Sequence, residues 1–385
     1  MENRSKEQIT ALILEAANRG STKTEMMYEA VLTYEKLSEY CTALLESGLI
    51  EFQIDERTYK TTEKGLSFLR DYRESACKTV RSISRQSEKV LIVGLGQLGF
   101  RVAKYVKERG FDTYGYDINT EAMEIAQRST GIKQVTDFGS DDFDVYVICV
   151  STHKPDDIFS PQIDGILSVA DKISREAKND ALVSIESTIP KGTSKKVFEI
   201  LNHRLHVVHA PHRWYASEEE EHGVNQLRVI GGVCDCCLRV GLQFYGNYND
   251  GIGRENYPTT SSSYKDLRIA MHPVSQIETA EITKIAENAH RYLQIAFAEE
   301  LYLYCQANEI NFPELRDALN TKWNVEILEA REGIGRHCLP KDTKMFLESS
   351  KFIRSKILAA AMEVDEDYKS YRAKLYPRPE RKISV

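Results

Sequence analysis

The feature that most constrains this chain is a glycine-rich turn between an apolar strand pattern and a helical pattern. Residues 89–99 read KVLIVGLGQLG, and the helical sequence FRVAKYVKERG follows directly. Gly94, Gly96 and Gly99 have the spacing G-x-G-x-x-G. In such a unit the first glycine permits a tight turn, the second lets the backbone approach a pyrophosphate, and the third lets helix and strand pack closely. The pattern predicts a Rossmann-type α/β sheet that binds a dinucleotide.

A second strand pattern indicates which dinucleotide is bound. The residues TYGYD end at Asp117, which lies 18 residues after Gly99. A carboxylate here accepts hydrogen bonds from ribose hydroxyls and repels a 2′-phosphate, which favours NAD over NADP. The expected cofactor is therefore NAD, although a similar turn also occurs in domains that bind another ligand or none. The predicted contacts in this region are Gly94, Leu95, Gly96, Gln97, Leu98, Gly99 and Asp117.

Three domains are predicted around this unit. Residues 1–80 have the order helix, helix, helix, hairpin, helix, which is that of a winged helix-turn-helix. Residues 88–265 alternate strand and helix patterns, as a doubly wound parallel sheet requires. Residues 266–375 are predicted to be all-α and to mediate dimerisation, with one long helical pattern over 275–308 that contains neither Gly nor Pro. The polar residues 75–88 are interpreted as a linker.

Composition and charge argue against several classes of protein. The 385 residues carry a formal net charge of −7, which disfavours broad phosphate binding. No apolar run approaches the length that spans a bilayer, and the polar start MENRSKEQIT is not a signal peptide. Eight cysteines without an export signal favour reduced thiols. We therefore expect a cytoplasmic protein without membrane association.

Three of the cysteines are close together in the sequence. Cys234, Cys236 and Cys237 form the pattern C-x-C-C. Metal binding is one interpretation, but no histidine or fourth cysteine follows at the usual spacing. The pattern favours ordinary residues at the start of a helix, and no metal site is predicted.

Four further segments resemble one enzyme family. They are DVYVICVSTHKP at 144–155, IESTIPKGTS at 185–194, ETAEITKIAENAHRYLQIAFAEE at 278–300 and GIGRHCLPKD at 333–342. In this order and at these distances they resemble the UDP-glucose/GDP-mannose dehydrogenase family, which includes the UDP-N-acetylmannosamine dehydrogenases. The resemblance extends over about residues 88–370.

The resemblance implies an NAD-dependent oxidation of a nucleotide sugar's primary alcohol to the carboxylate, with two NAD used in succession. Cys338 then matches the nucleophile, which holds the aldehyde as a thiohemiacetal and later as a thioester. Lys284 and Asn288 match the pair that stabilises the oxyanion and positions water, and their spacing of four puts both on one helical face. Asp342 matches a carboxylate that assists proton transfer, and Thr188 a threonine between cofactor and reacting carbon.

The chemistry is also plausible on the residues themselves. A thiolate is the best side-chain nucleophile near neutral pH, and nearby Lys284 and Arg336 would lower the pKa of Cys338. The alternative is that Cys338 is a small packing residue and Lys284 a solvated one. The resemblance also implies that Ser151, Thr152 and Ser187 contact the dinucleotide at strand ends.

Three departures from the family pattern concern the substrate. The family usually has a second Rossmann-like domain after the helical core, whereas 43 residues follow Asp342 here. Residues 211–213 read Pro-His-Arg where the family often has Pro-Glu-Arg, so His212 and Arg213 are expected near the substrate, with the role of His212 open. Arg336 stands where the family has glycine, and an arginine there can bind a substrate phosphate or carboxylate.

The N-terminal segment resembles archaeal winged-helix domains. Residues 1–85 contain 13 Lys and Arg against 14 Asp and Glu, and the segment 34–47 has three glutamates against one lysine. Duplex binding needs several cationic phosphate contacts, so a protein–protein or dimerisation role is favoured over DNA binding.

The leading interpretation is a homodimeric nucleotide-sugar 6-dehydrogenase. The main alternative is an NAD- or metabolite-responsive transcription regulator that keeps the dehydrogenase fold without normal turnover. A scaffold with vestigial sites is a third hypothesis.

Overall fold

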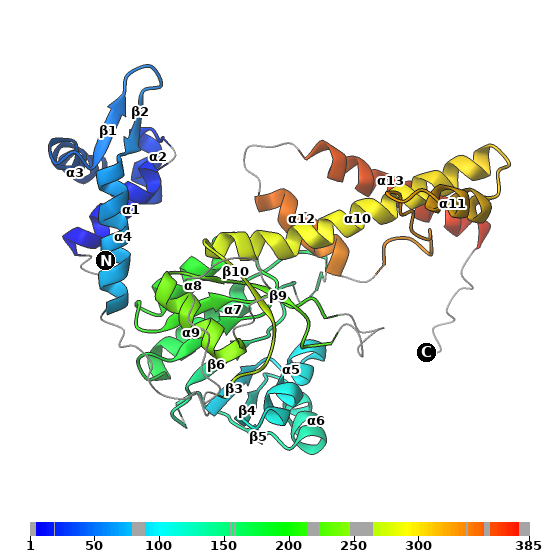
Figure 1. Ribbon diagram of the computed structural model, residues 1–385, viewed down its shortest axis with the longest axis horizontal. Coiled ribbons are helices and arrows are strands. Elements are labelled where there is room, and N and C mark those ends of the chain that lie inside the picture. The colour runs from blue at the N-terminus through cyan, green and yellow to red at the C-terminus, as the bar shows by residue number, and fades with distance from the viewer. Residues whose placement is uncertain are drawn as a thin grey trace. The chain divides into compact units, whose positions relative to one another are not determined.

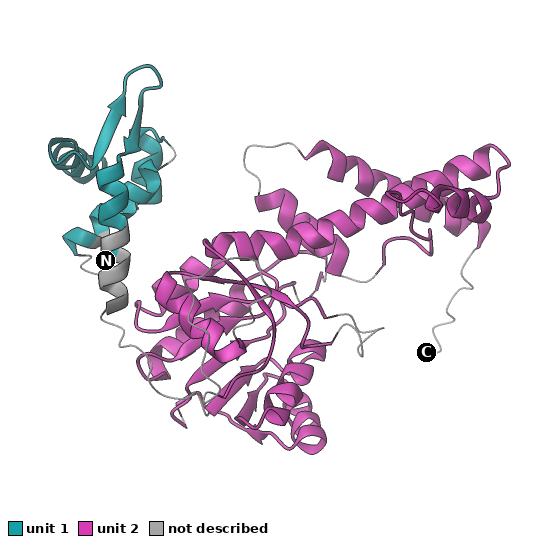
Figure 2. Cartoon of the chain, viewed as in Figure 1, with its two compact units in different colours: residues 1–82 teal, residues 83–385 magenta. Residues whose placement is uncertain are grey.

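The computed structural model is drawn in Figure 1. It describes residues 5–18, 20–78, 89–139, 141–154, 156–157, 159–214, 223–246, 265–335, 338–349 and 355–376. The chain forms two compact units, residues 1–82 and 83–385 (Figure 2). No helix among the described residues is long and apolar enough to cross a membrane.

The first unit is a winged helix-turn-helix, as predicted. Its elements are α1 (Lys6–Ala17), α2 (Lys23–Glu29), α3 (Tyr34–Glu46), β1 (Ile50–Gln53), β2 (Thr58–Thr61) and α4 (Glu63–Lys78). A capping box starts α2, in which Thr22 accepts from Glu25 N and the Glu25 carboxylate accepts from Thr22 N. β1 and β2 pair antiparallel. Because α4 continues to Lys78, the first residues interpreted as a linker are helical.

The leucines of this unit mainly build its own core. Leu37 is fully buried, and Leu12 and Leu32 pack against the same apolar cluster. Among the large apolar side chains exposed on this unit are Tyr28, Tyr34 and Leu45. Leu37 is buried inside the unit and cannot contact a partner protein. An interface on this unit would instead use the exposed side chains.

The second unit contains an eight-stranded sheet with the strand order β10-β9-β8-β7-β6-β3-β4-β5. All neighbours pair parallel except β8 and β9. The strands are β3 (Lys89–Val93), β4 (Asp112–Tyr116), β5 (Lys133–Gln134), β6 (Val145–Ile148), β7 (Leu182–Ile185), β8 (His206–His209), β9 (Arg228–Gly232) and β10 (Met271–Val274). The strand order reverses between β3 and β6, which is where open α/β sheets bind ligands.

Helices cover both faces of this sheet, so it is the doubly wound sheet that the sequence predicted. Its edge strand β10 lies within residues 266–375, however, so the prediction that this range is all-α is wrong at its start. They are α5 (Gln97–Glu108), α6 (Thr120–Thr130), α7 (Asp164–Glu176), α8 (Thr193–Ile200) and α9 (Asp235–Tyr245). Alternate strand residues supply two apolar cores: Val90 and Ile92 pack with α5, α6 and α9, while Leu91 and Val93 pack with α7 and α8.

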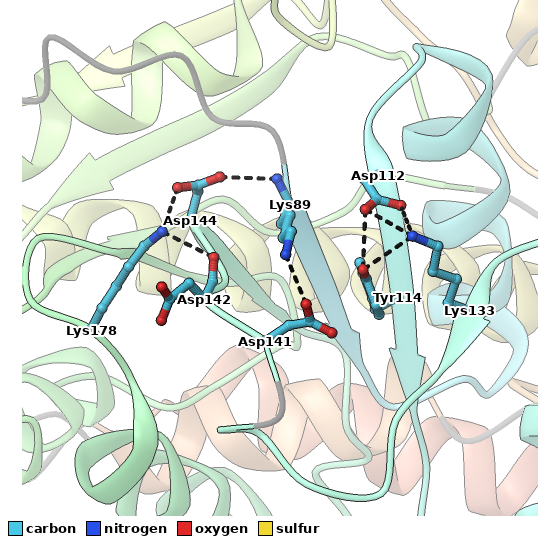
Figure 3. A network of polar contacts seen from close by, with 8 residues as sticks. All are labelled: Lys89, Asp112, Tyr114, Lys133, Asp141, Asp142, Asp144 and Lys178. Carbon is cyan, nitrogen blue, oxygen red and sulfur yellow. Dashed lines mark hydrogen bonds and ion pairs between the residues drawn. The ribbon is translucent and has the colours of Figure 1, made fainter.

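Ion pairs cover the edge where the parallel strands begin (Figure 3). Asp144 accepts from the backbone N of Lys89 at 2.9 Å and from Lys178 Nζ at 2.7 Å. Lys89 Nζ contacts Asp141 at 2.7 Å, and Lys133 contacts Asp112 at 2.9 Å. We call this the amino edge of the sheet. The opposite, carboxyl edge carries the glycine-rich turn.

The helical part of this unit follows the sheet. It consists of α10 (Ile277–Ala307), α11 (Phe312–Asn320), α12 (Cys338–Ser349) and α13 (Lys356–Leu375). The 31 residues of α10 confirm the predicted long helix, and Figure 1 shows α12 and α13 lying along it. Tyr292 and Ala296 on α10 share an apolar cluster with Ile334 and Ala361. This packing holds the loop before α12 against α10, the helix that also contains Lys284 and Asn288.

Candidate active site

The glycine-rich turn has the geometry that a dinucleotide requires. Gly94 has φ +93°, and a Cβ on it would lie 2.8 Å from the Cys149 backbone. A Cβ on Gly99 would lie 1.8 Å from Gly94 O, so helix and strand pack too closely for any other residue. Gly96, the N-cap of α5, has open space around its would-be Cβ. The N-terminus of α5 is therefore accessible to a phosphate group, which fits a dinucleotide.

Asp117 lies immediately beyond β4, beside this turn. Its Oδ2 accepts from Leu95 N at 2.6 Å, and its Oδ1 accepts from Asn119 N at 2.8 Å. A carboxylate has further acceptor capacity beyond these two bonds, and Asp117 is only partly buried. The backbone bonds fix its position, and the remaining lone pairs are available to ribose hydroxyls.

The ends of β6 and β7 bring the other predicted cofactor residues to the same edge. Thr152 is buried, whereas Ser151 is exposed and bonds His153 Nδ1 at 2.7 Å. Ser187 is buried and its Oγ donates to Val150 O at 2.7 Å. Ser187 therefore ties the two strand ends together. Thr188 follows it and is partly exposed at this edge.

Four of the five predicted catalytic residues come together between α10 and α12; the fifth, Thr188, lies beyond the end of β7. Asn288 Nδ2 donates to Asp342 Oδ2 at 2.5 Å, and Asp342 is buried. Burial lowers the pKa of Lys284, while the charges of Asp342, Glu287 and Cys338 oppose that shift. Cys338 is exposed and is the first residue of α12. The structure thus groups a thiol, an amine, an amide and a carboxylate, which is a set able to hold and hydrolyse an acyl intermediate.

A residue that the sequence analysis missed connects this group to the sheet. Lys341 is buried on α12, where its Nζ lies 3.1 Å from Asp342 Oδ1 and donates to Thr152 Oγ1 at 2.9 Å. The contact bridges the helical part and the carboxyl edge. The signal was available, because Lys341 lies inside the segment GIGRHCLPKD and precedes Asp342.

α13 holds the loop that leads into Cys338. Asp365 is buried and accepts from Ile334 N at 2.9 Å and from Tyr292 OH at 2.9 Å. Lys369 Nζ donates to Ile334 O at 3.0 Å, and Tyr368 OH donates to Arg331 O at 2.7 Å. α13 therefore fixes the position of residues 331–334, which precede Cys338 in the chain.

Beneath the carboxyl edge lies a buried polar network around Glu186. Its carboxylate contacts His212 Nε2 and Tyr245 OH, and lies 3.1 Å from Arg228 Nη1. Although burial alone raises the pKa of Glu186, the charge of Arg228 and the hydrogen bonds from His212 and Tyr245 lower it to about 2. Burial lowers the pKa of His212 to about 4. The histidine of the Pro-His-Arg segment is thus a neutral, buried partner of Glu186 near neutral pH.

Two further residues, Arg213 and Arg336, were predicted to lie near the substrate. Arg213 is partly buried, pairs with the Glu287 carboxylate on α10 and donates to Leu227 O at 3.1 Å. Its guanidinium therefore lies next to the turn of α10 that carries Lys284. Arg336 lies outside the described residues.

Comparison with known proteins identifies the family. The model described as the UDP-glucose/GDP-mannose dehydrogenase family, NAD binding domain, matches residues 120–249, and that family's central domain matches residues 278–367. A winged helix-turn-helix model matches residues 3–79. The chain belongs to the UDP-glucose/GDP-mannose dehydrogenase family. Its sheet is the NAD-binding domain of that family, with NAD as the cofactor.

Relatives of this dehydrogenase-family chain are archaeal and bacterial. A UDP-N-acetyl-D-mannosamine dehydrogenase of Methanococcus maripaludis is 26% identical over 306 residues, with 74% of this chain and 66% of the relative covered. One of Pyrococcus horikoshii is 29% identical, with 68% and 65% covered. A structure of UDP-D-ManNAc dehydrogenase from P. horikoshii superposes with a TM-score of 0.61 at 25% identity, covering 74% of this chain and 70% of that one. The chain spans about two thirds of the length of these relatives.

Proposed function

We propose that the chain oxidises the primary alcohol of a nucleotide sugar to the carboxylate, with NAD as hydride acceptor. The observation that carries the proposal is the junction of α10 and α12, where Asn288 and Lys341 both contact the buried Asp342 carboxylate. Lys341 also contacts Thr152 at the cofactor edge. This arrangement links a nucleophile helix to a dinucleotide-binding sheet, which is what two successive hydride transfers on one carbon require.

In the proposed reaction, NAD held at the N-terminus of α5 would supply the hydride acceptor for two successive oxidations of the alcohol carbon. The first step yields the aldehyde, and the Cys338 thiolate adds to it to form a thiohemiacetal. The second hydride transfer oxidises this adduct to a thioester. Water then hydrolyses the thioester, releasing the carboxylate and the Cys338 thiol. In total one alcohol, two NAD⁺ and one water give one carboxylate, two NADH and three protons.

The side chains divide this work by charge and position. The Lys284 ammonium, whose pKa burial lowers, stabilises the oxyanion of each tetrahedral adduct. Asn288 orients the attacking water, and Asp342 takes up its proton. Cys338 begins α12, and a helix N-terminus favours its thiolate form. Thr188 lies at the end of β7, between the cofactor edge and the reacting carbon.

Binding of the two ligands rests on separate groups. We propose that the pyrophosphate binds at the N-terminus of α5, with Gly94, Leu95, Gly96, Gln97, Leu98 and Gly99 around it. Asp117 binds the ribose of the cofactor, and Ser151, Thr152 and Ser187 line the adjacent strand ends. Arg213 and Arg336 are the proposed contacts to anionic groups of the substrate, and His212 supports that loop through Glu186.

A homodimer is proposed on the helical part. α10 is 31 residues long, and Phe297 and Tyr304 on it are about half exposed, at 51% and 56%. Large exposed aromatic side chains are typical anchors of an interface. Sedimentation of the full chain tests this, and a monomer at micromolar concentration would exclude it.

The test of the function is a screen of the purified full chain for NADH formation. Because the relatives carry the name UDP-N-acetyl-D-mannosamine dehydrogenase, UDP-N-acetyl-D-mannosamine is the first substrate, followed by other UDP- and GDP-sugars. The expected result is NADH and a sugar carboxylate from at least one of them. NAD binding without turnover of any substrate would favour the alternative below.

The alternative is a ligand-responsive regulator, which the winged-helix match favours. Gel-shift titration of residues 1–82 tests it. We expect weak binding, because residues 1–82 carry 12 Lys and Arg against 14 Asp and Glu and so have no net positive charge with which to release counterions. Sub-micromolar, sequence-selective binding to duplex DNA would favour the regulator hypothesis over the dehydrogenase hypothesis.

A further inference from the structure

The three clustered cysteines meet a histidine that is distant in the sequence. His206, the first residue of β8, lies against the start of α9, and one ring nitrogen lies within 4.8 Å of the sulfurs of Cys236 and Cys237. Those two sulfurs also lie within 4.8 Å of each other. Cys234 Sγ is 3.0 Å from Cys236 Sγ and 3.2 Å from Cys237 Sγ. The fold therefore brings His206 to Cys236 and Cys237, and Cys234 lies beside those two cysteines.

The described neighbours of the buried His206 do not satisfy the hydrogen-bonding capacity of its ring. His206 is 2% exposed, and neither of its ring nitrogens has a hydrogen-bond partner among the described residues. An imidazole carries one N–H donor and one acceptor when neutral, and burying polar groups without partners is unfavourable. A metal ion bonded to one nitrogen would satisfy it. Strand alternation points His206 to the same face as Val208, the face that α9 covers.

The sulfurs of the three cysteines lie side by side, and Cys237 is buried. A divalent cation would bind such neighbouring sulfurs as thiolates and release their protons.

We propose that His206, Cys234, Cys236 and Cys237 form a structural Zn²⁺ site. Three thiolates and an imidazole are one of the common ligand sets of closed, tetrahedral zinc sites, and soft thiolates select zinc over hard cations. In such a site the ligand atoms lie about 3.5–3.8 Å apart. His206, Cys236 and Cys237 have ligand atoms within 4.8 Å of one another, and Cys234 Sγ is 3.0 and 3.2 Å from the other two sulfurs, so Cys234 would have to turn toward His206 to complete the set. The C-x-C-C pattern alone did not reveal the site, because the fourth ligand comes 28 residues earlier on a neighbouring strand.

The location of the site determines its function. β8 runs parallel to β7, so His206 lies at the amino edge, whereas the proposed active site is at the carboxyl edge. Cys234 caps α9 directly after β9, which is the strand antiparallel to β8. A metal there would fasten the β9–α9 turn to β8 at the one antiparallel pairing of the described sheet. The zinc is therefore structural and takes no part in hydride transfer.

Metal content of the full-length protein tests the site. After expression with zinc and exhaustive dialysis, we expect about one zinc per chain. Cys236→Ser and Cys237→Ser should each lose most of it, whereas Cys305→Ser should keep it, because Cys305 is a buried cysteine on α10 outside the cluster. Wild type that neither retains nor takes up zinc overturns the proposal, as does equal zinc in all variants.

X-ray absorption at the zinc edge keeps the test independent of whether the variants fold. The wild-type protein should show about three sulfur neighbours at ~2.3 Å and one nitrogen at ~2.0 Å. A first shell of oxygen atoms would mean adventitious zinc and overturn the site. A thiol-preferring zinc chelator should lower the melting temperature, and added Zn²⁺ but not Mg²⁺ should restore it. Unchanged melting in the chelator would contradict the structural role.

Discussion

The two edges of the parallel sheet differ in what their charged side chains do. At the amino edge, Lys178 and Asp144 form an ion pair, Asp144 also accepts from the backbone N of Lys89, and Lys178 donates to the carbonyl oxygen of Asp142. At the carboxyl edge, Lys341 and Asp342 form a similar pair, but they also contact Thr152 and Asn288, which belong to the proposed active site. We propose that the pair at the amino edge supports stability, whereas the pair at the carboxyl edge orients reacting groups, because the second pair contacts residues of the proposed active site.

The largest expected effect concerns the nucleophile of the carboxyl edge. Cys338→Ser should lower carboxylate formation by about 10³-fold or more, because an alcohol is a far weaker nucleophile than a thiolate. NAD affinity should not change, since the proposed cofactor contacts are on the α5 turn and at the end of β4, away from Cys338. Steady-state assays and calorimetry measure the two quantities. Cys305→Ser is the control and should keep full activity; full activity in Cys338→Ser instead would eliminate the covalent mechanism.

The two lysines give the most direct comparison of the edges. Lys341→Met should reduce kcat by about 10²-fold, because Asp342 loses the cation that fixes it against Asn288 and small misplacements are costly. Lys178→Met, which breaks the pair with Asp144, should leave kcat within about twofold and lower only the melting temperature. Equal losses of kcat in the two variants would show that the edges do not differ as proposed.

Acid should weaken the carboxyl edge before the amino edge. The pKa of His212 is lowered by burial to about 4, so between about pH 6.5 and 4 the unfolded chain binds a proton that the folded chain excludes. Stability is complete above pH 6.5 and falls as the pH drops, by up to about 3 kcal/mol from this group. At the amino edge, hydrogen bonds from Lys133 and Tyr114 outweigh burial and lower the pKa of Asp112, so its contribution is lost only at more acidic pH.

Denaturant unfolding between pH 7 and 4 measures this difference. His212→Gln should flatten the pH dependence of the free energy of unfolding, because glutamine does not titrate. An unchanged pH dependence in that variant would mean that His212 is not the group that acid protonates.

The smallest expected effect concerns cofactor choice. NAD should bind more than about tenfold more tightly than NADP, because Asp117 repels a 2′-phosphate and accepts from the 2′-hydroxyl. Asp117→Asn should reduce that ratio by about tenfold. Calorimetry with both cofactors measures it, and equal affinities in the wild type would place the ribose away from Asp117.

Much of the fold could be predicted because local patterns determine it. The glycine spacing defines the β3–α5 turn, and the helical pattern at 275–308 became α10. The protein–protein role favoured for the winged helix was harder to assess, because periodicity identifies an apolar face but not whether that face packs within the unit, as Leu37 does.

The candidate site was predicted less completely, because its support comes from distant residues. Glu186 and Arg228 meet beneath the sheet edge although 42 residues separate them. His206 and Cys237 meet only because β8 and α9 are neighbours. Motif spacing identifies residues on one turn or one helix, whereas these contacts depend on strand order. Lys341 was recognisable in its motif, but its bond to Thr152 was not.

The stoichiometry of NADH per sugar tests the central claim most directly, namely that the carboxyl edge carries out both oxidations on one covalently held carbon. With a limiting amount of an accepted nucleotide sugar, the account predicts two NADH and one carboxylate per sugar, with no aldehyde released. One NADH per sugar and aldehyde in solution would contradict it, because the intermediate would then not be held by Cys338.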